Sequence, residues 1–226
     1  MVNNKAKSCE DVYNEDLISE SREVFLHSSL DCEDNGIDFR VASKFIKNIR
    51  ILEKKSSAPI ILHMLSTGGS WNDGMAIYDT ILQSSCSFCI ITYGIAASMA
   101  SLIPQAAHQR GKRITMPNCE WMIHEGWTEV QGTYRQVISN TQWDIVIRKK
   151  CYELYTEACL QRGSFFEGKS RAQVKSYIKR KLESKEDWWL DAEEAVNIGL
   201  CDMIVGQKGV ESVEKIVKNV PRILQL

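Results

Sequence analysis

The sequence predicts an α/β fold in which a largely parallel sheet is flanked by helices. Several short segments, among them residues 59–65 and 87–93, are nearly continuous apolar runs, which is typical of strands buried on both faces. Between these runs, apolar residues return at the spacing of an amphipathic helix. Because helices and strands alternate along the chain, the strands are expected to run parallel in one sheet. The length of 226 residues suits one domain with a sizeable core.

The first element expected after a polar, mobile segment over residues 1–22 is a short strand over residues 23–27. A helix should follow over residues 36–54, because four apolar residues recur there at spacings of four, four and three. They are Val41, Phe45, Ile49 and Leu52. Further strands are expected over residues 59–65, 87–93, 114–116, 119–124 and 201–205, and further helices over residues 72–83, 98–109, 133–162, 169–182 and 192–198. Pro104 should kink its helix or mark a first turn.

Composition and charge exclude several classes of protein. The net charge is −1 without a basic stripe, so nucleic acid is not an expected partner. The first 21 residues lack the apolar core of a secretory signal. Residues 88–104 are uncharged, but the segment is short and rich in hydroxyl groups, so no membrane span is expected. These features indicate a cytoplasmic chain.

The eight cysteines do not predict a metal site. Cys86 and Cys89 form the only C-x-x-C pair, whereas a zinc site usually needs a second such pair. Buried, reduced thiols are the better interpretation, and neither a metal nor another cofactor is expected.

The stretch from residue 91 to residue 101, ITYGIAASMAS, is organised around Ser98. An apolar run ends there, and a helical pattern begins at the next residue. A serine at a sharp strand-to-helix turn has an exposed Oγ, and the backbone N–H groups that follow it can face a developing oxyanion. A serine that merely caps the helix is the alternative.

Two other apolar runs end in residues that acyl-transfer chemistry needs. The run over residues 59–65 is followed by Ser66, Thr67, Gly68 and Gly69, and the run from residue 120 ends at His124. A nucleophile, a Gly-Gly turn and a histidine, each at the end of a separate strand, favour a serine hydrolase.

Several motifs recur in one order between residues 23 and 205: STGG, GMAIYDT, AASMA, GKR, PN, MIH and EDWWLDAEEAVNIGL. In this order they resemble the proteolytic subunit family of the Clp protease (ClpP). The resemblance implies a ClpP/crotonase-like fold of repeated ββα units, with a helical handle over residues about 127–183. It places the peptidase domain over residues 23–206, between the mobile N-terminal segment and a basic, mildly amphipathic C-terminal tail over residues 207–226.

The resemblance also implies a Ser-His-Asp triad. Ser98 matches the nucleophile, and His124 in the M-I-H motif matches the general base, which a serine hydroxyl requires at neutral pH. His63 is interpreted instead as a satisfied core histidine. The two other histidines are His108, near a helix end, and His27, which carries no functional signal.

Four acidic residues compete for the third position of the triad: Glu183, Glu186, Asp187 and Asp191. Counting back from AEEAVNIGL without a gap gives Asp187, and Asp191 then caps the next helix. The backbone N–H groups of Gly69 and Met99 match the oxyanion hole of the family.

The family implies a serine endopeptidase that degrades unfolded polypeptides inside a ring-shaped chamber, fed by a partner AAA+ ATPase. A homo-oligomer of two stacked heptameric rings is expected, with exposed apolar residues of the long helix and Phe165 and Phe166 at the contact between rings. The alternatives are a crotonase-like acyl-CoA enzyme and a non-catalytic assembly subunit.

Three departures from the family pattern bear on these expectations. Thr67 stands where the family usually has proline, and the gap between Ser98 and Gly111 is slightly longer than usual. The separation of His124 and Asp187 is also longer, with the extra length expected around residues 163–168. In the family this region is the handle that joins two rings, so the extra length bears on ring stacking. The N-terminal segment does not resemble the axial loops of the family, which bears on the ATPase partner.

Overall fold

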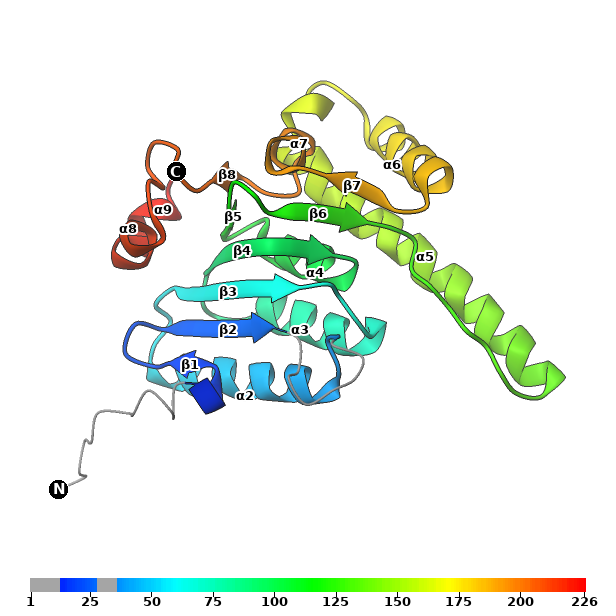
Figure 1. The fold of residues 1–226 in the computed structure, drawn as a ribbon, viewed down its shortest axis with the longest axis horizontal. Coiled ribbons are helices and arrows are strands. Elements are labelled where there is room, and N and C mark those ends of the chain that lie inside the picture. Colours follow the sequence, from blue (N-terminus) through cyan, green and yellow to red (C-terminus); the bar gives the residue numbers. More distant parts are fainter. Residues whose placement is uncertain (1–12, 28–35) are drawn as a thin grey trace.

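The computed structural model describes residues 13–27 and 36–226 and confirms the α/β fold class (Figure 1). The strands are β1 (Leu17–Ile18), β2 (Glu23–His27), β3 (Ile60–Ser66), β4 (Phe88–Ala97), β5 (Lys112–Thr115), β6 (Glu120–Ile123), β7 (Trp188–Leu190) and β8 (Met203–Ile204). The helices are α2 (Phe39–Lys55), α3 (Trp71–Gln83), α4 (Met99–Leu102), α5 (Tyr134–Arg162), α6 (Arg171–Lys185), α7 (Ala192–Ile198), α8 (Val213–Lys218) and α9 (Val220–Ile223), with 3-10 helices η1 (Ile103–Ala107) and η2 (Ser164–Phe166).

β4 is the strand around which the sheet is arranged. The strand order is β1-β2-β3-β4-β5-β8, while β6 pairs with β4 and then with β7. The first half of β4 pairs in parallel with β5, and its last three residues pair in parallel with β6. Ser66 of β3 lies opposite Ala96, and Met122 of β6 lies opposite Ala97. The residues that follow β3, β4 and β6 therefore meet at one edge of the sheet.

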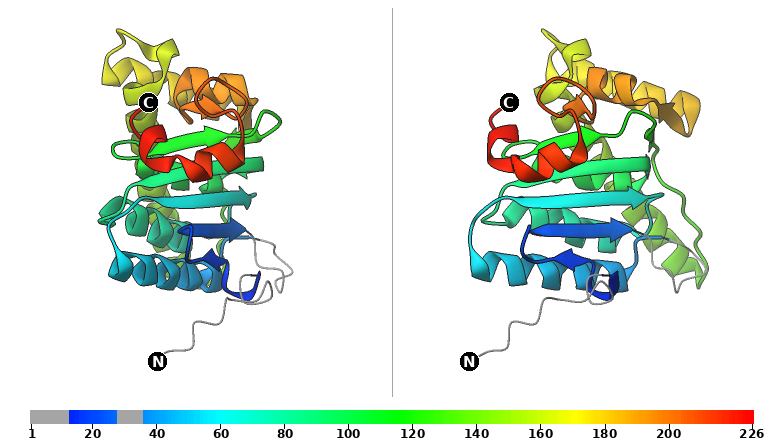
Figure 2. Two further views of the ribbon diagram at one scale, coloured as in Figure 1. Left: turned by 90° about the vertical axis from the view of Figure 1, so that its left-hand side faces the viewer. Right: turned by 60° about the vertical axis from the view of Figure 1, so that its left-hand side comes forward.

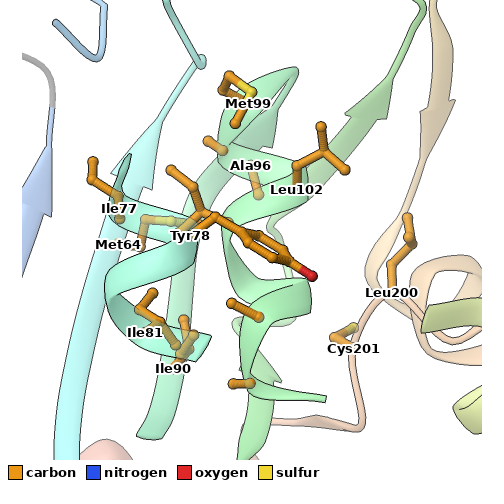
Figure 3. Packing of buried hydrophobic residues seen from close by; sticks show 14 of the residues in the cluster. Met64, Ile77, Tyr78, Ile81, Ile90, Ala96, Met99, Leu102, Leu200 and Cys201 are labelled. Atoms are coloured by element: carbon orange, nitrogen blue, oxygen red, sulfur yellow. The ribbon is translucent and has the colours of Figure 1, made fainter. Parts of the chain in front are cut away.

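The two faces of the sheet are covered by different parts of the chain. Alternate residues of β3, such as Leu62 and Met64, belong to the main core beneath α2 and α3. Figure 3 shows Ile77, Tyr78 and Ile81 of α3 packed in this layer with Met64 and Ile90. The opposite face carries a second, smaller core.

This second core includes the C-terminal segment that was expected to be a tail. Ile61, Cys89 and Ile91 of the sheet are buried there together with Ile216 of α8 and Ile223 of α9. These helices lie apart from α2 and α3 (Figure 2). Residues 207–226 thus include folded helices that contribute buried residues to the domain.

The long helix α5 has two different halves. It starts at a capping box, in which the Thr133 side chain accepts from the Gln136 N–H and the Gln136 side chain accepts from the Thr133 N–H. Its first half extends away from the sheet (Figure 1), and Trp143 is 61% exposed there. Its second half packs into the main core through Tyr155 and Cys159.

The prediction that Phe165 and Phe166 are both exposed was wrong for Phe166. Phe166 is 2% exposed in η2, and its ring lies 5.3 Å from that of Tyr177 on α6 in an edge-to-face contact. Phe165 is 41% exposed. The η2 segment between α5 and α6 is therefore partly a core contact, because the Phe166 ring is buried against α6.

Two short strands were not expected. Residues 1–12 of the segment predicted to be mobile lie outside the described residues, but Leu17 and Ile18 form β1, and Leu17 is buried. β7 was missed because three residues are too few to show a pattern. The predicted helix after Ser98 is a single α-turn followed by η1, and Pro104 marks a first turn of η1 as expected. No helix within residues 13–27 and 36–226 is long and apolar enough to cross a bilayer.

Candidate active site

Ser98 lies at the turn between β4 and α4 in a strained backbone conformation. Its φ of 54° and ψ of −126° lie outside the regions that non-glycine residues favour. Its N–H donates to the carbonyl of Met122 in β6 at 2.9 Å. Its side chain makes no capping hydrogen bond to α4, so the helix-cap alternative fails. The Ser98 Oγ is therefore not used to cap the helix and can bond to another side chain.

That partner is His124, which follows β6. His124 Nε2 lies 2.7 Å from Ser98 Oγ, and His124 Nδ1 lies 3.2 Å from Asp187 Oδ1. In the tautomer that carries its proton on Nδ1, the imidazole accepts from Ser98 Oγ and places its N–H beside the Asp187 carboxylate. The His124 side chain is 21% exposed and that of Asp187 is 55% exposed. The three residues form one continuous chain of polar contacts at the edge of the sheet.

The pairing of β6 with β7 explains why Asp187 reaches His124. Ile123 lies opposite Trp188 in this antiparallel ladder. His124, which follows Ile123, therefore faces Asp187, which precedes Trp188. The unpredicted strand β7 therefore positions Asp187, the residue directly before it, beside His124.

The other three acidic candidates have different neighbours. Glu183 pairs with Lys179 on α6 at 3.5 Å, Glu186 ends α6, and Asp191 caps α7 by accepting from the N–H of Glu194 at 2.8 Å. Of the four candidates, Asp187 is the one whose carboxylate lies within ion-pair distance of His124, at 3.2 Å.

The Gly-Gly turn after β3 packs directly against Ser98. Gly68 has a φ of 103°, and a Cβ placed on it would lie 2.7 Å from Ser98 Cβ and 2.9 Å from Met99 N. Gly69 has a φ of 149°, and its Cβ would lie 2.3 Å from the backbone nitrogen of Ile37. Only glycine fits either position. Met99 is the first residue of α4, so its N–H has no acceptor within the helix.

The three remaining histidines have contacts other than the triad. Both ring nitrogens of His63 are bonded, Nδ1 to the Tyr93 hydroxyl at 2.8 Å and Nε2 to a Glu23 oxygen at 2.9 Å, which confirms a satisfied core histidine. Burial lowers the pKa of His63 despite the Glu23 carboxylate, which disfavours a charged imidazole. His27 pairs with Asp16, and His108 is buried near the end of η1.

The described cysteines are unpaired and buried. Burial raises the pKa of Cys89 and of Cys151 to about 12, which keeps these thiols protonated and poor ligands. Cys9 and Cys32 lie outside the described residues. Among the residues that the structure describes, no cluster of three or more metal-ligating side chains occurs.

Sequence analysis missed two residues that contact the turn at Ser98. Ser101 Oγ donates to the Ser98 carbonyl at 2.7 Å and lies 2.7 Å from the Tyr155 hydroxyl. Serine and tyrosine at these positions carry no motif signal, because their proximity arises only when α5 packs behind the turn.

Comparison with known proteins identifies the family. The Clp protease family model matches residues 4–208. The chain is 29% identical over 204 residues to proteolytic subunit 1 of the ATP-dependent Clp protease of Mycobacterium tuberculosis, covering 90% of each chain. It is 30% identical over 192 residues to proteolytic subunit 2 of Mycolicibacterium paratuberculosis, covering 84% of this chain and 85% of the relative.

A solved structure agrees at the level of the fold. A ClpP1 mutant from Listeria monocytogenes superposes with a TM-score of 0.68 and 23% identity, covering 86% of this chain and 96% of the other. The family match spans most of the domain predicted from the sequence, so the resemblance is confirmed and the crotonase-like alternative is not supported. The protein is a serine peptidase of the Clp protease family.

Proposed function

We propose that Ser98, His124 and Asp187 carry out peptide-bond hydrolysis as nucleophile, general base and orienting acid. The observation that carries this proposal is the continuous chain of contacts from Ser98 Oγ through His124 to Asp187. A nucleophile that is hydrogen-bonded to its base, with a carboxylate on the far side of that base, is the arrangement that activates a serine hydroxyl.

The arrangement supports the following sequence of steps. Ser98 Oγ attacks the carbonyl carbon of the peptide bond while its proton passes to His124 Nε2, and Asp187 stabilises the imidazolium that forms. The backbone N–H groups of Gly69 and Met99 donate to the oxyanion of the tetrahedral intermediate. His124 then gives its proton to the leaving amine, which leaves an ester on Ser98. Water, deprotonated by His124, hydrolyses this ester and restores the hydroxyl.

The expected substrates are unfolded polypeptides and short peptides. Residues 126–132, directly after the His124 turn, contain neither helix nor strand, and Trp127 among them is 80% exposed. Such a segment offers main-chain groups with which an extended substrate can pair as an added strand. Pairing through main-chain groups contacts few side chains of the substrate, so loose selectivity for the substrate sequence is expected.

We further propose a homo-oligomer of two stacked heptameric rings that works with an AAA+ ATPase in the cytoplasm. The names of the relatives support ATP dependence, since they are subunits of ATP-dependent Clp proteases. The outer half of α5 supports an assembly contact. Tyr134 is 80% exposed and Trp143 is 61% exposed, and large aromatic side chains on a projecting helix are costly without a partner.

Hydrolysis of an unfolded, dye-labelled polypeptide tests the triad. Wild type should cleave it, and Ser98→Ala should lose turnover while keeping its native mass. His108→Ala is a control, because this histidine lies away from the triad. Turnover by Ser98→Ala at the wild-type rate would refute the assignment of the nucleophile. An inactive wild type would instead favour the alternative of a non-catalytic subunit.

A further inference from the structure

Behind the turn at Ser98, two buried hydroxyl groups connect the nucleophile to α5. Ser101 Oγ donates to the Ser98 carbonyl at 2.7 Å, and the Tyr155 hydroxyl lies 2.7 Å from the same Oγ. A carbonyl only accepts, so the Ser101 proton is committed to Ser98 and Tyr155 must donate to Ser101. Ser101 is 0% exposed and Tyr155 is 1% exposed, so water does not replace either bond.

These bonds act on the strained part of the site. The Ser98 N–H donates to the Met122 carbonyl. The Ser98 carbonyl accepts from both the Ser101 N–H at 2.9 Å and the Ser101 Oγ. A strained conformation persists only where the surrounding contacts determine it. The Ser101 hydroxyl, oriented by Tyr155, is one of the contacts that fix the peptide plane between Ser98 and Met99.

The same face of α5 also holds the strand end that carries His124. Cys151 Sγ lies 3.8 Å from the His124 carbonyl, and the next residue, Glu125, accepts from Arg148 at 2.6 Å and from the Tyr152 hydroxyl. Residues 148, 151, 152 and 155 share one side of a helix. One helix face therefore contacts the backbone of both the nucleophile and the base.

We propose that Tyr155 is a positioning residue for the reaction, acting through the Ser101 hydroxyl to hold the Ser98 turn. This inference rests on the proposed function of Ser98. Tyr155 is 1% exposed and bonds to Ser101 rather than to the Ser98 Oγ, so it acts through Ser101 and not on the substrate. Its removal should displace the Oγ slightly, and small displacements of reacting groups are costly in rate.

The test compares Tyr155→Phe, Ser101→Ala and the double variant, with kcat and KM measured on a fluorogenic peptide. Thr156→Val is the matched control, because the neighbouring Thr156 hydroxyl on α5 is equally buried and has no hydrogen-bond partner among the described residues. Each single variant should lower kcat by ~10-fold with KM unchanged, since only the geometry of the reacting atoms is altered. Thr156→Val should retain the wild-type kcat.

The double variant separates a shared pathway from two independent defects. Because Tyr155 acts through Ser101, the double variant should be no slower than Ser101→Ala. A kcat of Tyr155→Phe equal to wild type, or losses that multiply in the double variant, would overturn the proposal. Native mass and melting temperature are measured for every variant. If Tyr155→Phe does not fold, Ser101→Ala decides alone, and its wild-type kcat would overturn the proposal equally.

Ser98→Ala in the same assay keeps the two proposals distinct. If Ser98→Ala is inactive and Tyr155→Phe is fully active, only the positioning role is refuted. If Ser98→Ala retains turnover, the nucleophile assignment itself fails, and the positioning role fails with it.

Discussion

Replacing Asp187 with asparagine should slow turnover more than replacing it with alanine. Asp187 Oδ1 lies 3.2 Å from His124 Nδ1, where its charge favours the imidazole tautomer that carries its proton on Nδ1. An asparagine can turn its amide N–H₂ toward Nδ1 and so stabilise the opposite tautomer. In that tautomer Nε2 carries the proton and cannot accept one from Ser98 Oγ at 2.7 Å.

The exposure of Asp187 sets the size of the two effects. Its side chain is 55% exposed, so water can enter when the carboxylate is removed and can accept from Nδ1 in its place. Asparagine is expected to lower kcat by about 10³- to 10⁴-fold, and alanine by about 10²- to 10³-fold, in line with the cost of a wrong tautomer in a triad.

Peptide turnover and native mass are measured together, so that a loss of assembly is not mistaken for a loss of catalysis. Glu186→Gln is the matched control, because Glu186 is the adjacent exposed acid and ends α6 without reaching His124. Glu183→Gln removes the partner of Lys179 and should also be neutral. A loss of turnover in either glutamine variant, with a fully active Asp187→Asn, would refute the assignment of the acid.

Three further outcomes are expected. Gly68→Ala should lower stability by about 1–3 kcal/mol and slow turnover, because the new Cβ would lie 2.7 Å from Ser98 Cβ; a melting temperature and kcat equal to wild type would contradict this. Burial would raise the pKa of Asp202, but Arg113 lowers it overall, so the pair stabilises the fold above the ordinary aspartate pKa of 3.8 and progressively less as the pH falls through the lowered value. Urea unfolding from about pH 6 to pH 3 should show this loss in wild type and a flatter profile in Asp202→Asn, which should also be weaker at neutral pH by about 3–5 kcal/mol, and identical slopes would exclude the linkage. Trp143→Asp should reduce the native mass seen by light scattering after size exclusion, whereas Gln142→Asp, which adds the same charge one residue earlier, should not; equal masses would place the assembly contact elsewhere.

The sequence was informative where a motif and a strand end coincide. Ser98, His124 and the Gly-Gly turn each follow an apolar run, and parallel strands bring such ends to one edge of a sheet. The proximity of these residues could therefore be predicted from the sequence alone. The position of Asp187 beside His124 depends in addition on how β6 and β7 are paired. β7 has only three residues and shows no periodic pattern, so this pairing could not be predicted.

Contacts between distant elements could not be predicted. The bond between Ser101 and Tyr155 joins residues 54 positions apart, and only the packing of α5 against the Ser98 turn brings them together. The burial of Phe166 likewise depends on Tyr177 of α6, which closes over η2. Local hydrophobicity does not distinguish Phe166 from its exposed neighbour Phe165, because both are equally apolar and differ only in which side of the turn they occupy.

The central claim is that Ser98 is an activated nucleophile, and covalent labelling by a fluorophosphonate tests it most directly. The intact mass of the wild-type chain should rise by one adduct, and peptide mapping should locate that adduct on Ser98. Ser98→Ala should remain unlabelled under the same conditions, and Ser101→Ala should still label at Ser98. An adduct on another residue, or labelling of Ser98→Ala at the wild-type level, would contradict the account.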